Sequence, residues 1–288
     1  MGRSPKPRAS CLARSLFLLE MKLWKRGGRH LTVFFDKLRS DHEGAPHFCR
    51  NGGKRMKVRC CWEHNGDDTL LYALDDVGAY TRGQNLAAAL AKMPEEIACY
   101  RAWLGQGTPE DVTVEVAQEK VSTLTIADAD SDVLLDGEEV PLTREAYDRL
   151  KALALRSARD FLTLYQSIPD KDASCLPMRD TFYGPVPRTA RQMYEHTKNV
   201  NRYYFGEIGV DADNDGTILA CRQRGFALLE QSADFLSLPP AEGSYGEMWS
   251  PRKVLRRFVW HDRIHAKAMY RMAVRTFGAC ENPFRFIK

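Results

Sequence analysis

The chain has 288 residues, of which 44% are hydrophobic and 28% are charged, which is ordinary for a globular protein and leaves room for two domains. The positive sign of its formal net charge of +4 is due to residues 1–55, which hold 13 basic and 4 acidic side chains. Acidic side chains therefore outnumber basic ones in the rest of the chain. This balance argues against nucleic acid as a partner. No apolar stretch approaches the roughly 18 residues of a membrane-spanning helix.

Residues 1–55 do not have the features of a secretory signal peptide. Arg14 and Glu20 interrupt the apolar run, and too few uncharged residues lie between them for a signal. Residues 51–55 can be encoded by a purine-rich stretch typical of a bacterial ribosome-binding site, directly before Met56. We therefore expect a non-native leader with the natural start at Met56. A disordered basic tail is the alternative.

Residues 56–137 predict a small α+β domain. Short strands are expected at residues 56–63, 69–74 and 77–82. Residues 86–103 then show a helical apolar period that Gly105 ends. Two apolar-polar alternations in residues 112–126, at 112–116 and 121–126, predict one or two further strands. The acidic, turn-rich residues 127–137 are expected to end this domain.

Four runs in this domain carry a family resemblance. They are Leu71–Asp76, Ala79–Gly83, Leu86–Leu90 and Tyr100–Leu104. Through these four runs, residues 56–105 resemble the HicB-like antitoxin domain. The resemblance implies a small α/β fold that binds a protein partner. Antitoxin function is not carried over, because the sequence shows no DNA-binding module of the kind such proteins usually carry.

Four long helical patterns occupy the second half of the chain. They cover residues 143–168, 187–208, 217–236 and 251–277. Thr143 is a good N-cap for the first, and Ser250 followed by Pro251 is a typical start for the fourth. Four such helices with short or moderate links predict an up-down four-helix bundle in residues 138–288. We therefore expect an α+β protein of two domains.

The fourth helical pattern carries two histidines four residues apart. His261 and His265 stack one turn apart on one helix face, the spacing with which a helix offers two nitrogen ligands to one metal ion. Both fall on the apolar stripe that includes Val254, Phe258 and Met272. A hydrogen-bonded core histidine is the ordinary explanation for one such residue. Two unpaired imidazoles in one core are costly to bury, so the pair favours a metal site.

The second helical pattern supplies the third predicted ligand. His196 lies on its apolar stripe with Met193 and Val200. Three histidines from two facing helices leave coordination positions free, as in catalytic rather than structural metal sites. Neutral imidazoles suit Zn²⁺, Ni²⁺ or Fe²⁺, so the pattern does not distinguish these metals.

The placement of one histidine in the second helix and a His-x-x-x-His pair in the fourth also resembles a known superfamily. Residues 142–280 resemble the DinB-like proteins, which include bacillithiol- and mycothiol-dependent enzymes. The resemblance implies a metal-binding bundle, often a homodimer, in which the metal activates a thiol or water. His196, His261 and His265 are the matching ligands, and a low-molecular-weight thiol is the implied cosubstrate.

Several neighbouring side chains are weighed as accessories to this site. Glu195 and Glu207 are candidate partners of the ligands, whereas Asp262 is expected to make a surface pair. Cys221 and Cys280 are redox candidates only if they lie near the metal. The eight cysteines show no Cys-x-x-Cys spacing, which favours reduced thiols and a cytoplasmic protein.

The fourth helix also carries a cluster of basic residues that we expect to form a solvated face. They are Arg252, Lys253, Arg256, Arg257, Arg263 and Lys267. Binding of phosphates, or attraction of an anionic thiol cofactor, is the alternative interpretation.

Two functions follow from the sequence. The first is a divalent-metal-dependent enzyme, a thiol transferase or a hydrolase, with catalytic residues unassigned. The second is a non-enzymatic interaction protein whose HicB-like domain binds a partner and whose metal is structural or vestigial.

Overall fold

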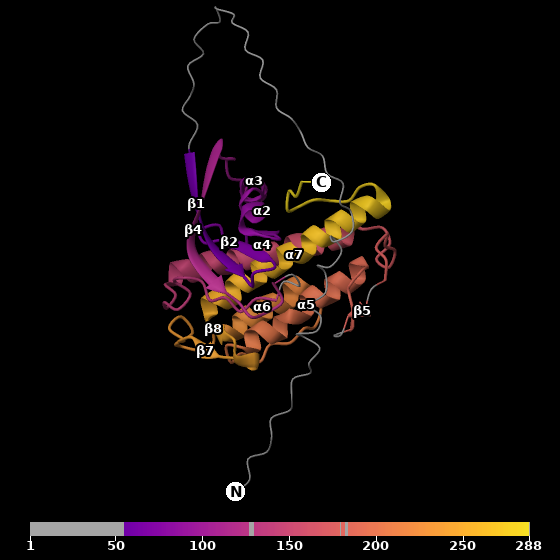
Figure 1. The fold of residues 1–288 in the computed structure, drawn as a ribbon. Helices are drawn as coiled ribbons and strands as arrows, with labels where there is room; N and C mark the ends of the chain where they lie inside the picture. The colour runs from indigo at the N-terminus through magenta and orange to yellow at the C-terminus, as the bar shows by residue number, and fades with distance from the viewer. Residues whose placement is uncertain (1–54, 127–129, 179, 182–183, 288) are drawn as a thin grey trace, which may run out of the picture.

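The structure is a computed structural model that describes residues 55–126, 130–178, 180–181 and 184–287 (Figure 1). The predictions for the leader lie outside the described residues, apart from Arg55. The described part combines helices with a small mixed sheet, which confirms an α+β fold. None of its helices is both long and apolar enough to cross a membrane.

Four strands form this sheet in the order β3-β2-β1-β4. They are β1 (Arg55–His64), β2 (Thr69–Ala73), β3 (Tyr80–Gly83) and β4 (Asp111–Val121). β1 pairs antiparallel with β2 and parallel with β4, with a shift of register between Cys60 and Cys61. The three predicted strands before residue 84 are confirmed. The alternation in residues 121–126 is not a separate strand, because β4 ends at its first residue.

The predicted helix over residues 86–103 is two helices, α2 (Leu86–Leu90) and α3 (Met93–Leu104). Pro94 lies in the first turn of α3, where its missing N–H costs nothing. In a continuous helix the ring of Pro94 would clash with the carbonyl of Leu90, so the chain starts a new helix there. Gly105 ends α3 in the left-handed conformation at φ 72°, as the sequence predicts.

All four predicted long helices are present. They are α4 (Arg144–Ser167), α5 (Ala190–Gly206), α6 (Ile218–Leu229) and α7 (Pro251–Phe277). α6 is shorter than predicted because residues 230–236 form turns, from which the buried Phe235 packs edge-on against Tyr147 with ring centroids 4.8 Å apart. Because Phe235 is buried, the apolar sequence pattern of α6 continues into this turn and resembles that of a longer helix.

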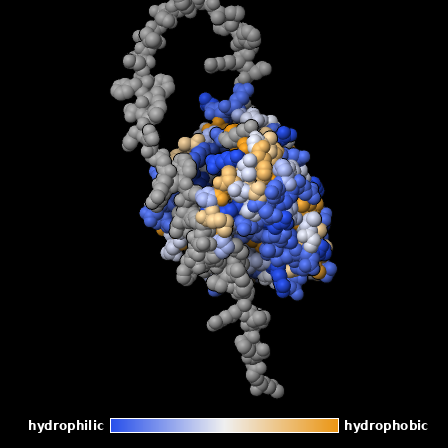
Figure 2. All heavy atoms as spheres, turned by 90° about the vertical axis from the view of Figure 1, so that its right-hand side faces the viewer, coloured by the Kyte–Doolittle hydropathy of each residue, from blue (hydrophilic) through white to orange (hydrophobic). Residues whose placement is uncertain are grey.

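Short hairpins lie in the long connections. β5 (Asp180–Thr181) pairs with β6 (Gly184–Pro185) before α5, and β7 (Ala241–Glu242) pairs with β8 (Met248–Trp249) before α7. The 3₁₀ turn η3 (Ser244–Gly246) connects the second pair. On the face shown in Figure 2, hydrophobic residues lie in small groups among hydrophilic ones.

α7 is the central helix of the molecule. It packs against α4 and α5, and α6 packs against the same two helices. Figure 1 shows α7 passing between the sheet on one side and α5 and α6 on the other. Trp260 of α7 contacts Tyr72 and Tyr80 of the sheet, with ring centroids 5.6 and 6.3 Å apart.

The sheet and the helices share one hydrophobic core. A single cluster of buried side chains runs from Val58 and Leu71 in the sheet through Trp103 of α3 to Phe161 of α4 and Phe258 of α7. The segments predicted as two domains, residues 56–137 and 138–288, are therefore packed together through continuous apolar contacts.

The prediction of a solvated basic face on α7 is wrong. Lys253, Arg256, Arg257 and Arg263 are 0–5% exposed, and only Arg252 and Lys267 are partly exposed. The helical period identifies one inward stripe, and it takes the opposite side to be wet. Here the opposite side is covered by α3, the sheet and the segments before and after residue 135, which the period of α7 cannot reveal.

Three carboxylates neutralise these buried cations. Glu96 of α3 lies 2.6 Å from Arg263 and 2.9 Å from Lys267. Glu138 pairs with Arg256 through two contacts of 2.5 and 3.0 Å, and Glu247 pairs with Lys253 and Arg257 at 3.0 and 3.2 Å. Buried charges persist only when they are paired, so these contacts hold α7 in a defined orientation against its neighbours.

Candidate metal centre

Well-capped helices position the three predicted ligands. Thr189 caps α5, and its side chain and that of Gln192 each accept a hydrogen bond from the other's backbone N–H. His196 lies two turns into this helix on its buried side. Ser250 caps α7 by accepting from the N–H of Lys253 at 3.1 Å, and Pro251 opens the helix, as predicted.

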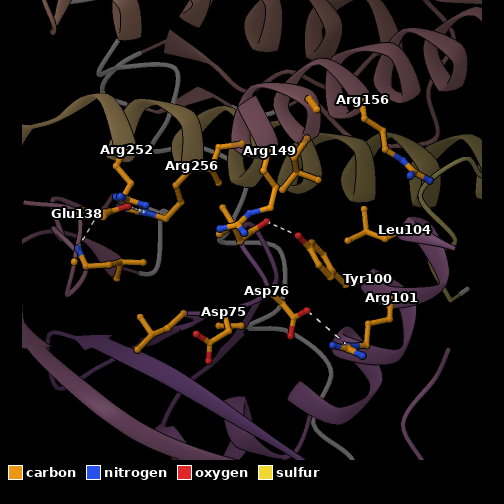
Figure 3. Close-up of a pocket in the computed structure, with 18 of the residues that line it drawn as sticks. Asp75, Asp76, Tyr100, Arg101, Leu104, Glu138, Arg149, Arg156, Arg252 and Arg256 are labelled. Carbon is orange, nitrogen blue, oxygen red and sulfur yellow. Dashed lines mark hydrogen bonds and ion pairs between the residues drawn. The ribbon is translucent and has the colours of Figure 1, made fainter. Parts of the chain in front are cut away.

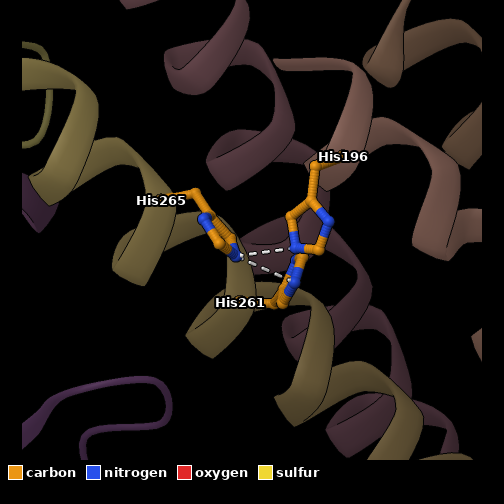
Figure 4. Close-up of side chains that lie close together, drawn as sticks. All are labelled: His196, His261 and His265. Carbon is orange, nitrogen blue, oxygen red and sulfur yellow. Dashed lines mark hydrogen bonds between the residues drawn. The ribbon is translucent and has the colours of Figure 1, made fainter. Parts of the chain in front are cut away.

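The structure brings the three histidines together (Figure 4). The Nε2 atom of His265 lies 3.1 Å from Nε2 of His196 and 3.1 Å from Nε2 of His261. The three side chains are 4%, 7% and 0% exposed, in that order. In Figure 4 the rings from α5 and α7 point toward one another. The three predicted ligands therefore lie close together, and they are buried between the helices.

The nitrogen spacing fits a metal ion. Imidazole nitrogens bind Zn²⁺ at about 2.0–2.1 Å, so two nitrogens 3.1 Å apart subtend an angle of about 98° at the metal. That angle lies between the octahedral value of about 90° and the tetrahedral value of about 109°. All three ligand atoms lie within 4.8 Å of one another, which is close enough to hold one metal ion.

Hydrogen bonding among the histidines explains this arrangement less well. An imidazole nitrogen carries either one hydrogen or one in-plane lone pair, so Nε2 of His265 can make only one well-directed hydrogen bond. It nevertheless has two Nε2 neighbours at the same distance. A shared cation satisfies all three lone pairs at once.

The electrostatic surroundings keep two of the imidazoles neutral. Burial, followed by the neighbouring His265, holds the pKa of His196 well below its usual 6.5. Burial also lowers the pKa of His261 well below 6.5, with further contributions from the other two histidines and from Arg257 and Arg222. Only the neutral form has a lone pair free for a metal, so the fold prepares these ligands for binding.

Asp262 is a buried residue and not part of a surface pair as predicted. Both Asp262 and Arg222 of α6 are fully buried, and Arg222 donates to the two carboxylate oxygens at 2.5 and 3.2 Å. Burial raises the pKa of Asp262, and Arg222 opposes that shift. This pair ties α6 to α7 next to the candidate ligand His261. The sequence offers no spacing signal for Arg222, which comes from a different helix.

The other accessory candidates lie apart from the centre. Glu195 makes an ion pair with Lys198 at 2.7 Å, and Glu207 accepts from the backbone N–H of Ser244 at 2.6 Å. Burial raises the pKa of Cys221 and of Cys280. Among the described residues, neither cysteine belongs to the cluster that could hold a metal. A raised pKa also makes a thiol a poor nucleophile.

Tyr204 of α5 is a neighbour of the centre that sequence reasoning missed. Its ring lies edge-on to that of His261, with centroids 6.0 Å apart. Burial raises the pKa of Tyr204 to about 12, so its hydroxyl keeps its proton. The same ring packs on Trp249 and Phe258 at 5.4 and 5.3 Å, which fixes its place beside the imidazole.

Searches with family models, among curated proteins and among solved structures find no match for this chain. The HicB-like and DinB-like resemblances therefore rest on the residues quoted for them, and the evidence for the site is its geometry.

Proposed function

We propose that this chain is a divalent-metal-binding protein with His196, His261 and His265 as its ligands. The observation that carries the proposal is the convergence of three Nε2 atoms, with His265 3.1 Å from each of the others. The lowered pKa values of His196 and His261 support it, because neutral imidazoles are the binding form.

We further propose that the protein is of the DinB-like type and acts as a thiol transferase or a hydrolase. Four mutually packed helices with the ligands on α5 and α7 support this assignment. A bound Zn²⁺, Ni²⁺ or Fe²⁺ would supply Lewis acidity, which lowers the pKa of a thiol or water in contact with it. His196 and His261 would provide lone pairs, and the Arg222–Asp262 pair would hold α7 in place.

A structural metal in a non-enzymatic interaction protein is the second candidate. The complete burial of His261, and the near-complete burial of His196 and His265, favour it. In this case the HicB-like segment, residues 56–137, would bind a protein partner. The mixed sheet flanked by α2 and α3 supports a HicB-like unit there.

Elemental analysis of the purified protein tests the metal site. We expect about one equivalent of a first-row divalent metal in the wild type and much less in His261→Ala. His64→Ala is the matched control, because His64 lies in β1 and bonds to Glu119 at 3.0 Å, away from the centre. Equal metal content in His261→Ala and the wild type would refute the site.

Assays of the metal-loaded protein separate the two candidates. Turnover of a low-molecular-weight thiol with an electrophile, or hydrolysis of an ester or amide, that disappears in His261→Ala supports the enzyme. Stoichiometric metal without turnover over a panel of thiols and electrophiles supports the structural role.

A further inference from the structure

A second candidate site lies on the opposite side of α7 from the histidines. A cavity of about 770 Å³ opens between the sheet and the helices (Figure 3). Its walls are the segments 73–77 and 135–138 together with parts of α3, α4 and α7. This volume is within the range of sites that bind small molecules, and such sites often lie where two parts of a fold meet. It also exceeds the volume that a single free amino acid fills.

One wall of the cavity is cationic. Arg149 of α4 and Arg252 of α7 line it, and neither has a carboxylate partner within the part of the chain that the structure describes. The three other arginines that line the cavity are neutralised by acidic side chains: Arg256 by Glu138, Arg101 by Asp76 and Arg156 by Asp160. Figure 3 shows Arg149 and Arg252 extending from the helices toward the cavity.

The facing wall is acidic. Asp75 lines this wall, is exposed, and makes no ion pair with any residue placed in the structure. Asp136 is also exposed and without such a pair, and it lines the cavity in the same segment as Glu138. Asp76, next to Asp75, is 7% exposed, and its Oδ2 atom has no hydrogen-bond partner among the described residues. Asp75 and Asp76 lie across the cavity from the arginines of α4 and α7 (Figure 3).

The floor between the charged walls is apolar. Leu104 and Leu153 line this part of the cavity and are partly exposed, and the buried Tyr100 and Leu150 lie beneath them. The Tyr100 hydroxyl donates to the carbonyl of Val77 at 2.8 Å, and its ring is 2% exposed, so it lies beneath this apolar surface. A ligand with an apolar body would cover these side chains.

The charge pattern selects a class of ligand. A simple anion would gain from Arg149 and Arg252 but would be repelled by Asp75 and Asp136, and a simple cation would meet the reverse. A molecule with a carboxylate at one end and an ammonium at the other pairs with both walls. We propose that this cavity binds a short unmodified peptide, with its carboxylate at Arg149 and Arg252, its amino terminus at Asp75 and its apolar side chains over Leu104 and Leu153.

Calorimetric titration of the full chain with the tripeptide alanyl-leucyl-alanine tests this proposal. We expect saturable binding, and we expect N-acetylation or C-amidation of the peptide to weaken it at least about tenfold each. No heat of binding up to roughly 10 mM peptide would overturn the proposal. Equal affinity for the N-acetylated peptide would also overturn it, because the site would then recognise an anion alone.

Paired substitutions locate the two ends of the ligand. Arg149→Gln should weaken binding of the free peptide about tenfold and leave the affinity for the amidated peptide unchanged. Asp75→Asn should do the same for the free and acetylated peptides. Arg144→Gln is the matched control, because Arg144 lies on α4, is paired with Asp148 and does not line the cavity. An equal effect of Arg149→Gln on both peptides would refute the assigned orientation.

The peptide site and the metal centre can fail separately. The peptide proposal predicts the same affinity before and after treatment with a chelator, because the cavity contains none of the three histidines. A loss of peptide binding on chelation would overturn the proposal of an independent site.

Discussion

Replacing His265 by alanine tests the metal centre most sharply, because its Nε2 atom is the one that lies 3.1 Å from both of the others. Free metal at about 100 times Kd stabilises a protein by about 2.7 kcal/mol. For a chain of this size 1 kcal/mol shifts the unfolding midpoint by roughly 2–4 °C, so metal should raise the Tm of the wild type by roughly 5–11 °C.

Without His265, only the candidate ligands His196 and His261 remain, and the nitrogen that lies 3.1 Å from each of them is lost. We expect metal to shift the Tm of His265→Ala by less than about 2 °C. The assay is thermal unfolding of chelator-treated protein with and without added Zn²⁺, so each variant serves as its own reference. His64→Ala should keep the full wild-type shift. A shift in His265→Ala equal to that of the wild type would mean that the metal binds elsewhere.

Three further predictions concern the supports of this fold. Glu96→Gln leaves the buried Arg263 without its carboxylate and should cost about 3–5 kcal/mol in urea unfolding, whereas a loss below about 1 kcal/mol would mean that the pair is effectively solvated. Gly78→Ala should destabilise the protein by about 1–3 kcal/mol in the same assay, because Gly78 has φ +95° and a Cβ there would lie 2.4 Å from a valine side chain of α7. A variant as stable as the wild type would show that this turn does not pack on α7. In the metal-free protein, the folded-state pKa values of His196 and His261 lie below the unfolded value of 6.5, so the unfolded state binds more protons in acid. The free energy of unfolding should therefore have its full value above pH 6.5. As the pH drops below 6.5, it should decrease by up to about 1.4 kcal/mol per pH unit for each histidine, as measured by urea unfolding. The slope should be shallower in His196→Gln. Equal slopes would contradict this assignment.

Local patterns were sufficient for most of the secondary structure. Caps and breakers lie close to the residues that they affect, so Ser250 with Pro251 predicted the start of α7, and Gly105 the end of α3. The break at Pro94 was also legible in the chain, but the apolar period over residues 86–103 hid it. Residues 230–236 were misassigned because Phe235 packs like a helix residue while it lies in a turn.

The convergence of the three candidate ligands was predictable for a physical reason. His261 and His265 follow from helical geometry alone, and His196 follows because a buried histidine on a second apolar stripe has few other places to lie. The partners of these residues were not predictable. The Arg222–Asp262 pair joins two helices, and no spacing within either helix signals that contact.

The sequence by itself determined the helices, the strands and the three candidate ligands, because each depends on spacing within one element or on an apolar stripe. Only the tertiary structure decided what lies on the far side of α7. A helical period identifies one buried face, and burial of the opposite face depends on which distant segment covers it. Here α3 and the sheet cover that face, so cations that look solvated in the sequence are buried against Glu96, Glu138 and Glu247.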